Sequence, residues 1–260
     1  MATLSVRDIA SDCLGKSGDI SIDTDVYGYI FRDTDGSVFG ALGPADTFPG
    51  SGQPTARSLK RHLETISGEA IDLFVFLVGH ENNFSGSVTQ GNVTEMQYAL
   101  QVARDVYAQV DLGIRRIKWL RIPAEEATDN ELLDLADGAA AASLTDDYSG
   151  PDGGIDVFVV QSIGNAAGFA ALEGPCDKNA SDVMSGAVLE VSNSRRWTGI
   201  VLAHEVGHYL GLPTGPAITN LMGVDNNPPF GIDEITPNST GLTDSQGSTM
   251  RSHCSVDPPC

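Results

Sequence analysis

The pentapeptide H-E-V-G-H at residues 204–208 constrains this chain of 260 residues more than any other feature of its sequence. Positions four residues apart lie on one face of an α-helix, so both imidazoles can reach a single metal ion. The preceding run at 199–203 is apolar or glycine, which favours a buried helix over a surface helix that carries these residues by chance. We therefore expect His204 and His208 to bind zinc, with Glu205 beside the metal as the general base.

Two features downstream extend this pattern. Gly211, three residues after the motif, permits a sharp change of direction, and Asn220-Leu221-Met222-Gly223 is typical of a tight turn that carries a methionine. With these residues the chain resembles the metzincin zinc peptidases, whose active helix runs H-E-x-x-H-x-x-G-x-x-H and is followed by a Met-turn. The sequence H-E-V-G-H-x-L-G-L is most similar to that of the pappalysin-like members. The resemblance covers residues 199–254 and includes an expected C-terminal helix at 242–251.

The resemblance implies an α+β fold, a metzincin-like zincin domain with a mixed sheet, an active-site helix and a Met-turn. It also implies a zinc-dependent endopeptidase that acts on a peptide or protein substrate. In that chemistry Glu205 takes a proton from a metal-activated water and passes it to the departing amine. Met222 would form an apolar floor beneath the histidines, and Tyr209 is expected to pack in the core.

One position departs from the family pattern. The third metal ligand should stand at residue 214, where this chain has Thr214. A hydroxyl is a poor zinc ligand beside imidazole, thiolate or carboxylate. Asp225, close to the turn, is the favoured substitute, and Thr214 acting through a water, Glu234 and His253 stay open. His253, in the C-terminal tail, fits a structural role better than a ligand role.

Two other functions stay open beside the peptidase. The first is a metzincin-like domain that has lost turnover and serves as a binding or structural module, for which Thr214 is the main support. Retention of Glu205 counts against it, because a binding module has no evident use for a base. The second is a zinc hydrolase of a non-peptide amide or ester, which would use the same helix residues.

The acidic charge balance disfavours negatively charged partners. The chain has 15 basic and 35 acidic side chains, a formal net charge of −20, so nucleic acid and anionic membranes are disfavoured. The longest apolar stretch, at 73–78, is too short to cross a membrane. Residues 1–20 lack the basic start and apolar core of a signal peptide, yet the acidic composition suits an extracellular protein.

The four cysteines, Cys13, Cys176, Cys254 and Cys260, allow three pairings. Two disulfides would suit a secreted peptidase, and four buried thiols are the alternative. Cys254 and Cys260 could close a small loop, or either could join Cys176 or Cys13. A thiolate from Cys13 could instead occupy the open position of the zinc and make the N-terminal region inhibitory.

The organisation along the chain predicts two units. Residues 1–65 are rich in Gly, Asp and Ser and predict a small β-rich unit, and residues 66–260 predict the zincin-like domain. The run at 23–28 begins like a calcium loop, but Tyr27 and Thr34 stand where carboxylates are needed, so the support for calcium is slight.

Within the larger unit, hydrophobic patterning predicts alternating strands and helices. The expected strands are 72–78, 114–122, 155–160 and 186–191. The expected helices before the active helix are 92–110, opened by a capping box at Asn92 to Glu95, and 130–142. The strand at 186–191 is expected to lie at a sheet edge and to pair with an extended substrate backbone.

Overall fold

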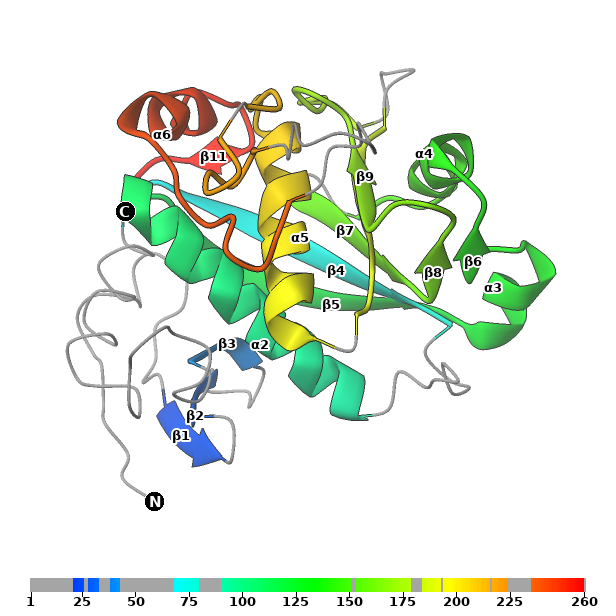
Figure 1. The fold of residues 1–260 in the computed structure, drawn as a ribbon. Coiled ribbons are helices and arrows are strands. Elements are labelled where there is room, and N and C mark those ends of the chain that lie inside the picture. The colour runs from blue at the N-terminus through cyan, green and yellow to red at the C-terminus, as the bar shows by residue number, and fades with distance from the viewer. Residues whose placement is uncertain are drawn as a thin grey trace.

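The computed structural model of the protein is a mixed sheet with helices on both faces (Figure 1). The structure describes residues 21–25, 28–32, 38–42, 68–79, 90–150, 153–178, 184–192, 194–215, 217–223 and 235–259. In the first three of these ranges, in 90–95 and at residues 97 and 119, only the backbone is described.

Four parallel strands form the centre of the described sheet, and short antiparallel strands complete it. The order is β5-β4-β7-β10-β9, with β11 beside the first two residues of β4. The strands are β4 (Ala70–Val78), β5 (Gly113–Ile122), β7 (Ile155–Val160), β9 (Gly168–Ala170), β10 (Gly186–Glu190) and β11 (Val256–Asp257). The pairing therefore confirms the expected mixed sheet.

Each face of the sheet buries its own apolar core because side chains alternate along a strand. Residues 73, 75 and 77 of β4 pack with α2 and α5, which lie across one face in Figure 1. Residues 76 and 78 pack with α3 and α4 on the other face. The helical elements are α2 (Gln90–Tyr107), η2 (Ala108–Val110), α3 (Ala124–Asp129), α4 (Gly138–Asp147), α5 (Arg195–Tyr209) and α6 (Asp244–Arg251).

The strands expected at 72–78, 114–122, 155–160 and 186–191 are confirmed within two residues at each end. The helix expected at 130–142 is wrong. α3 ends at Asp129, Glu131 adopts a left-handed conformation with φ of 56°, and a two-stranded sheet of β6 (Asp134–Leu135) and β8 (Ser162–Ile163) intervenes. α4 begins only after Asp137, whose carboxylate accepts from the backbone N–H groups of Ala139 and Ala140.

Two further expectations are corrected. The capping box at Asn92 is wrong, since the helix already begins at Gln90. The strand expected at 186–191 is not an edge strand, because β10 pairs with β7 on one side and with β9 on the other. Within the described part of the sheet the edge is β9, a strand of three residues whose length leaves no clear alternation in the sequence.

The N-terminal region contains three strands that form a separate antiparallel sheet, β1 (Ser21–Asp25), β2 (Gly28–Arg32) and β3 (Val38–Leu42). The domain boundary at residue 65 lies outside the described residues and stays a prediction. The backbone of Asp23 to Asp25 belongs to β1, and the calcium hypothesis stays a prediction.

Cys176 and Cys254 form a disulfide across 78 positions of the sequence, with their Cα atoms 5.8 Å apart. This is one of the pairings that the sequence left open. Cys13 and Cys260 lie outside the described residues, so an inhibitory role for Cys13 stays a hypothesis. Among the helices that the structure describes, none has both the length and the hydropathy that a membrane crossing requires.

Candidate metal centre

Helix α5 carries the H-E-x-x-H motif and is deeply buried. Ser194 caps its N-terminus by accepting a hydrogen bond from the backbone N–H of Trp197. The residues from Thr198 to Gly207 are all buried, and His204 and Glu205 are only 6% and 7% exposed. A helix that displayed these side chains on the surface by chance would be solvated on this face. The burial therefore favours an active-site helix.

The two imidazoles converge from successive turns of α5. Their Nε2 atoms lie 3.0 Å apart, and the rings meet edge to face at 87°. The Nδ1 atom of His204 lies 2.8 Å from the carbonyl oxygen of Leu221, and that of His208 lies 2.7 Å from the carbonyl oxygen of Leu212. A carbonyl can only accept, so each Nδ1 carries the proton and each Nε2 carries a lone pair.

This arrangement fits a zinc ion. Two lone pairs that face one another across 3.0 Å repel, and a cation bound by both relieves the repulsion. Two nitrogens about 2.1 Å from a tetrahedral zinc lie about 3.4 Å apart, which is close to the separation found here. Histidine ligands of metals almost always donate their other ring N–H to a carbonyl or carboxylate. Both histidines meet this requirement.

The carbonyl acceptors come from the two downstream features of the motif. Gly211 turns the chain with a φ of 90°, a conformation that residues with a side chain rarely adopt, and this turn delivers Leu212 to His208. The backbone N–H of Gly223 donates to the carbonyl of Asn220, which closes a tight turn around Leu221. Met222 in this turn is fully buried, and its sulfur lies 3.0 Å from where a Cβ on Gly207 would stand.

The C-terminal helix α6 holds this turn in place. The side-chain amides of Asn220 and Gln246 exchange two hydrogen bonds of 2.8 and 2.9 Å. The Asn220 side-chain oxygen also accepts from the backbone N–H of Met222. Gln246 is at the same time part of the capping box with Thr243 that begins α6. The expected C-terminal helix therefore supports the backbone that orients His204.

Glu205 lies beneath the edge strand β9. A Cβ on Gly168 would stand 2.6 Å from Cγ of Glu205, so only glycine lets the strand approach this closely. Burial raises the pKa of Glu205 to about 8. On the other side of α5, the hydroxyl of Tyr107 donates to the carbonyl of Ala203 at 2.7 Å. Burial, with a smaller contribution from the charge of Glu205, raises the pKa of Tyr107.

The described residues supply two of the expected metal ligands. Among them, no group of three or more His, Cys, Asp or Glu side chains is placed to hold a metal. Thr214 is exposed, and its neighbour Gly215 donates to the carbonyl of Met222, which brings position 214 beside the turn. Asp225 and Glu234 lie outside the described residues, so the preference for Asp225 stays a prediction.

His253, the remaining ligand candidate, and Tyr209 both have structural positions. His253 makes a hydrogen bond of 3.0 Å through Nε2 to the carbonyl of Gly174, and its ring lies against Tyr209. Tyr209 is fully buried, and its hydroxyl donates to the carbonyl of Pro175. These placements agree with the structural histidine and the core tyrosine expected from the sequence.

Tyr107, Gly168 and Gln246 also belong to the site, and the sequence motifs did not point to them. Tyr107 lies 96 positions before its hydrogen-bond partner, and Gln246 lies 26 positions after Asn220. Tyr107 stands out only as one of several apolar residues at helical spacing. Gln246 carried a local signal, because Thr243 followed three residues later by Gln is a capping pattern. None of these residues carried a signal that connects it to the motif.

Burial of Glu205 makes the stability of the metal-free protein depend on pH, and the direction of the change can be predicted. Its pKa is about 8 in the folded state against an ordinary value of 4.5, so between these values the folded state holds a proton that the unfolded state has released. The stabilisation of the folded state by this proton is fully present below the ordinary pKa and is lost as the pH rises through the folded-state pKa. In chelator-treated protein, the midpoint temperature of thermal unfolding should fall further between about pH 5 and pH 9 in the wild type than in Glu205→Gln. Parallel profiles for the two proteins would show that the carboxyl is not buried as described.

Gln246→Ala tests the link between α6 and the turn. The substitution leaves the Asn220 side chain without its partner, and we expect the free energy of unfolding in urea to fall by about 2 kcal/mol. Zinc affinity, measured by chelator competition, should fall about tenfold, since the Leu221 carbonyl that orients His204 moves with the turn. Ser248→Ala on the exposed side of α6 is the control and should change stability by less than about 0.5 kcal/mol. Equal zinc affinity in both variants would contradict the role given to Gln246.

Comparison with known proteins finds a metallopeptidase family. Residues 93–213, which run from α2 to just past Gly211 and form just under half of the chain, match the family model described as Metallo-peptidase family M12B Reprolysin-like. No curated protein sequence matches the chain. The solved structures that match include the archaemetzincin from Methanopyrus kandleri, with 12% identity and a TM-score of 0.46 over 72% of this chain and 96% of that chain. The family match confirms the expected resemblance to metzincin-type zinc peptidases over the segment that carries α5.

Proposed function

We propose that this protein is a zinc-dependent endopeptidase in which His204 and His208 hold the metal and Glu205 is the general base. The observation that carries the proposal is the convergence of two Nε2 atoms whose Nδ1 atoms are both held by carbonyls. A buried carboxylate follows the first histidine, as this chemistry requires. The match of residues 93–213 to a metallopeptidase family supports the same reading.

Zinc bound there would supply a Lewis acid that polarises a water molecule and the substrate carbonyl. Glu205 accepts the proton of the attacking water and delivers it to the nitrogen of the departing amine. The hydrogen bond from Tyr107 to the carbonyl of Ala203 holds the helix backbone just before His204. Met222 packs beneath the helix, and we propose that the turn at 220–223 is the Met-turn of the site.

The edge strand β9 is evidence for a peptide as the substrate. Its outer edge is not paired with any strand in the described part of the sheet, and Gly168 within it lies directly over Glu205. An extended peptide that adds to this edge would gain main-chain hydrogen bonds and would pass the base. This feature favours a polypeptide over the small amide or ester of the alternative hydrolase.

We also propose an extracellular location. The Cys176–Cys254 disulfide supports it, since disulfides persist in oxidising compartments, and the acidic composition agrees. Thr214 remains the main support for the alternative, a binding module without turnover.

The catalytic assignment makes a paired prediction. His204→Ala and His208→Ala should each lose zinc, measured by elemental analysis of the dialysed protein. Glu205→Gln should keep zinc near the wild-type amount, yet casein hydrolysis should fall by at least about a thousandfold. Zinc retained in either alanine variant would reject the ligand assignment. Zinc bound by a wild type that cleaves no peptide would favour the binding module.

The third ligand is tested by three variants at two positions. We expect Asp225→Asn to weaken zinc binding by about tenfold or more, and Thr214→Val to weaken it less. Thr214→His should strengthen binding, because it restores an imidazole at the family position. Competition with a chelator ranks the three proteins. Release of zinc by Thr214→Val alone would identify the hydroxyl as the ligand and reject Asp225.

A further inference from the structure

A short segment of backbone crosses the last turn of α5. We call residues 173–176, which follow the edge strand β9, the strap. The backbone N–H of Glu173 donates to the carbonyl of His208 at 2.9 Å, and that of Gly174 donates to the carbonyl of Tyr209 at 2.8 Å. The strap therefore binds the helix at the proposed metal ligand itself.

These two hydrogen bonds cap α5. The last four carbonyls of a helix have no partner within it, and one that stays unpaired when buried is costly. Tyr209 is fully buried, and the strap supplies the donor that its carbonyl needs. The carbonyl of His208 also accepts from the backbone N–H of Gly211, so loss of the strap would remove the donor to Tyr209 and one of the two backbone donors to His208. Both carbonyls belong to the last helical turn, which the strap therefore stabilises.

The C-terminal tail holds the strap against the helix. Cys176 at the end of the strap is bonded to Cys254, and Nε2 of His253 donates to the carbonyl of Gly174 at 3.0 Å. The hydroxyl of Tyr209 donates to the carbonyl of Pro175 at 2.9 Å. Its ring packs so closely on Gly174 that a Cβ there would lie 2.2 Å away. The disulfide is the one covalent bond among these contacts between the tail, the strap and the helix.

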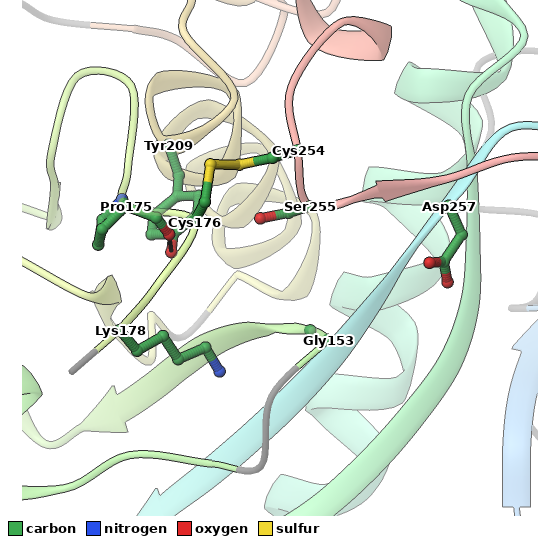
Figure 2. Close-up of a pocket in the computed structure, with 9 residues that line it drawn as sticks. Gly153, Pro175, Cys176, Lys178, Tyr209, Cys254, Ser255 and Asp257 are labelled. Carbon is green, nitrogen blue, oxygen red and sulfur yellow. Dashed lines mark hydrogen bonds between the residues drawn. A yellow bond between two sulfur atoms is a disulfide. The ribbon is translucent and has the colours of Figure 1, made fainter. Parts of the chain in front are cut away.

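The disulfide can be reached by a small reagent. Cys176 and Cys254 are both exposed, and their sulfurs line an open cavity of about 60 Å³ together with Pro175, Tyr209 and Ser255 (Figure 2). In Figure 2 the bond lies between the strap and the tail, beside the ring of Tyr209. An attacking thiolate can therefore approach the sulfurs without unfolding of the sheet.

We propose that the Cys176–Cys254 disulfide makes the metal site redox-dependent by holding the strap that caps α5 at His208. This regulation rests on the proposed zinc site. A small thiol, as its thiolate, attacks one sulfur, forms a mixed disulfide and expels the other cysteine as a thiolate. A second thiol attacks the mixed disulfide and releases the second cysteine and a small-molecule disulfide. Two electrons pass from the two thiols to the protein, the strap loses its covalent anchor, and its hydrogen bonds to the carbonyls of His208 and Tyr209 weaken.

The first experiment removes the disulfide. In Cys176→Ser/Cys254→Ser we expect the backbone amides of Glu173 and Gly174 to exchange hydrogen at least about tenfold faster, while those of β4 and β7 stay protected. Zinc affinity by chelator competition should fall about tenfold or more. Unchanged exchange at 173 and 174, or unchanged zinc affinity, would overturn the proposal.

Leu144→Ala separates this effect from a general loss of stability. Leu144 is fully buried in the core on the opposite face of the sheet, so its truncation destabilises the fold without touching the strap. We expect strap exchange and zinc affinity within about twofold of wild type at a temperature where the protein is folded. A tenfold loss of zinc affinity in this control would overturn the proposal, because any destabilisation would then weaken the site.

Tyr209→Phe serves if the double variant does not fold. It keeps the disulfide and removes only the hydroxyl that holds Pro175, so strap exchange should rise and zinc affinity should fall about fivefold. No change in either would overturn the proposal. Hydrogen exchange of the strap amides is measured without metal. A wild type that binds no zinc would therefore reject the proposed function, and the exchange result for the strap could still be interpreted.

Reduction is tested directly on the folded wild type. After treatment with dithiothreitol without denaturant, alkylation and mass spectrometry should find Cys176 and Cys254 labelled while the amides of β4 remain protected. Labelling that appears only when β4 also loses protection would overturn the switch, since the disulfide would then open only on global unfolding.

Discussion

Two hydrogen bonds, from Nδ1 of His204 to Leu221 and from Nδ1 of His208 to Leu212, are the interactions on which the rest of the site depends. They orient both rings and place the proton on Nδ1, which leaves Nε2 for a metal. Neither carbonyl belongs to α5, so the helix alone does not define the site. Its precision depends on the turn after Gly211 and on the turn at 220–223.

The core holds those two turns in register with the helix. Leu212 and Leu221 are 1% and 0% exposed and belong to the same apolar cluster as α2 and α5. The backbone N–H of Leu221 also donates to the carbonyl of Gly241, which leads directly into α6. Because a packed interior transmits small displacements, the segments after the helix, and not the helix alone, position the candidate metal site.

The parts of this structure that could be predicted from sequence are those that depend on neighbours along the chain. The helix at 204–208, the glycine turn and the buried strands each follow from local pattern, and all are present. The helix at 130–142 could not be foreseen as wrong, because the left-handed conformation of Glu131 leaves no trace in composition. The edge position of β9 depends on its pairing with β10, and the contact of Tyr107 with Ala203 joins residues 96 positions apart. Such contacts arise only from the assembled layers, and no local pattern reports them.

Burial of Glu205 links its proposed role as the base to the proposed metal. A pKa of about 8 means that Glu205 carries a proton at neutral pH when no cation is near, and a protonated carboxyl cannot accept another. Raising the pKa by this amount corresponds to about 5 kcal/mol against the ionised form. A divalent cation about 5 Å from a carboxylate, at an effective dielectric constant of about 20, contributes about 7 kcal/mol in its favour. A divalent metal held by His204 and His208 would therefore offset the whole penalty and favour the ionised carboxylate of Glu205. In the proposed mechanism, the burial that keeps Glu205 protonated in the metal-free protein would therefore not prevent it from acting as the base once a metal is bound.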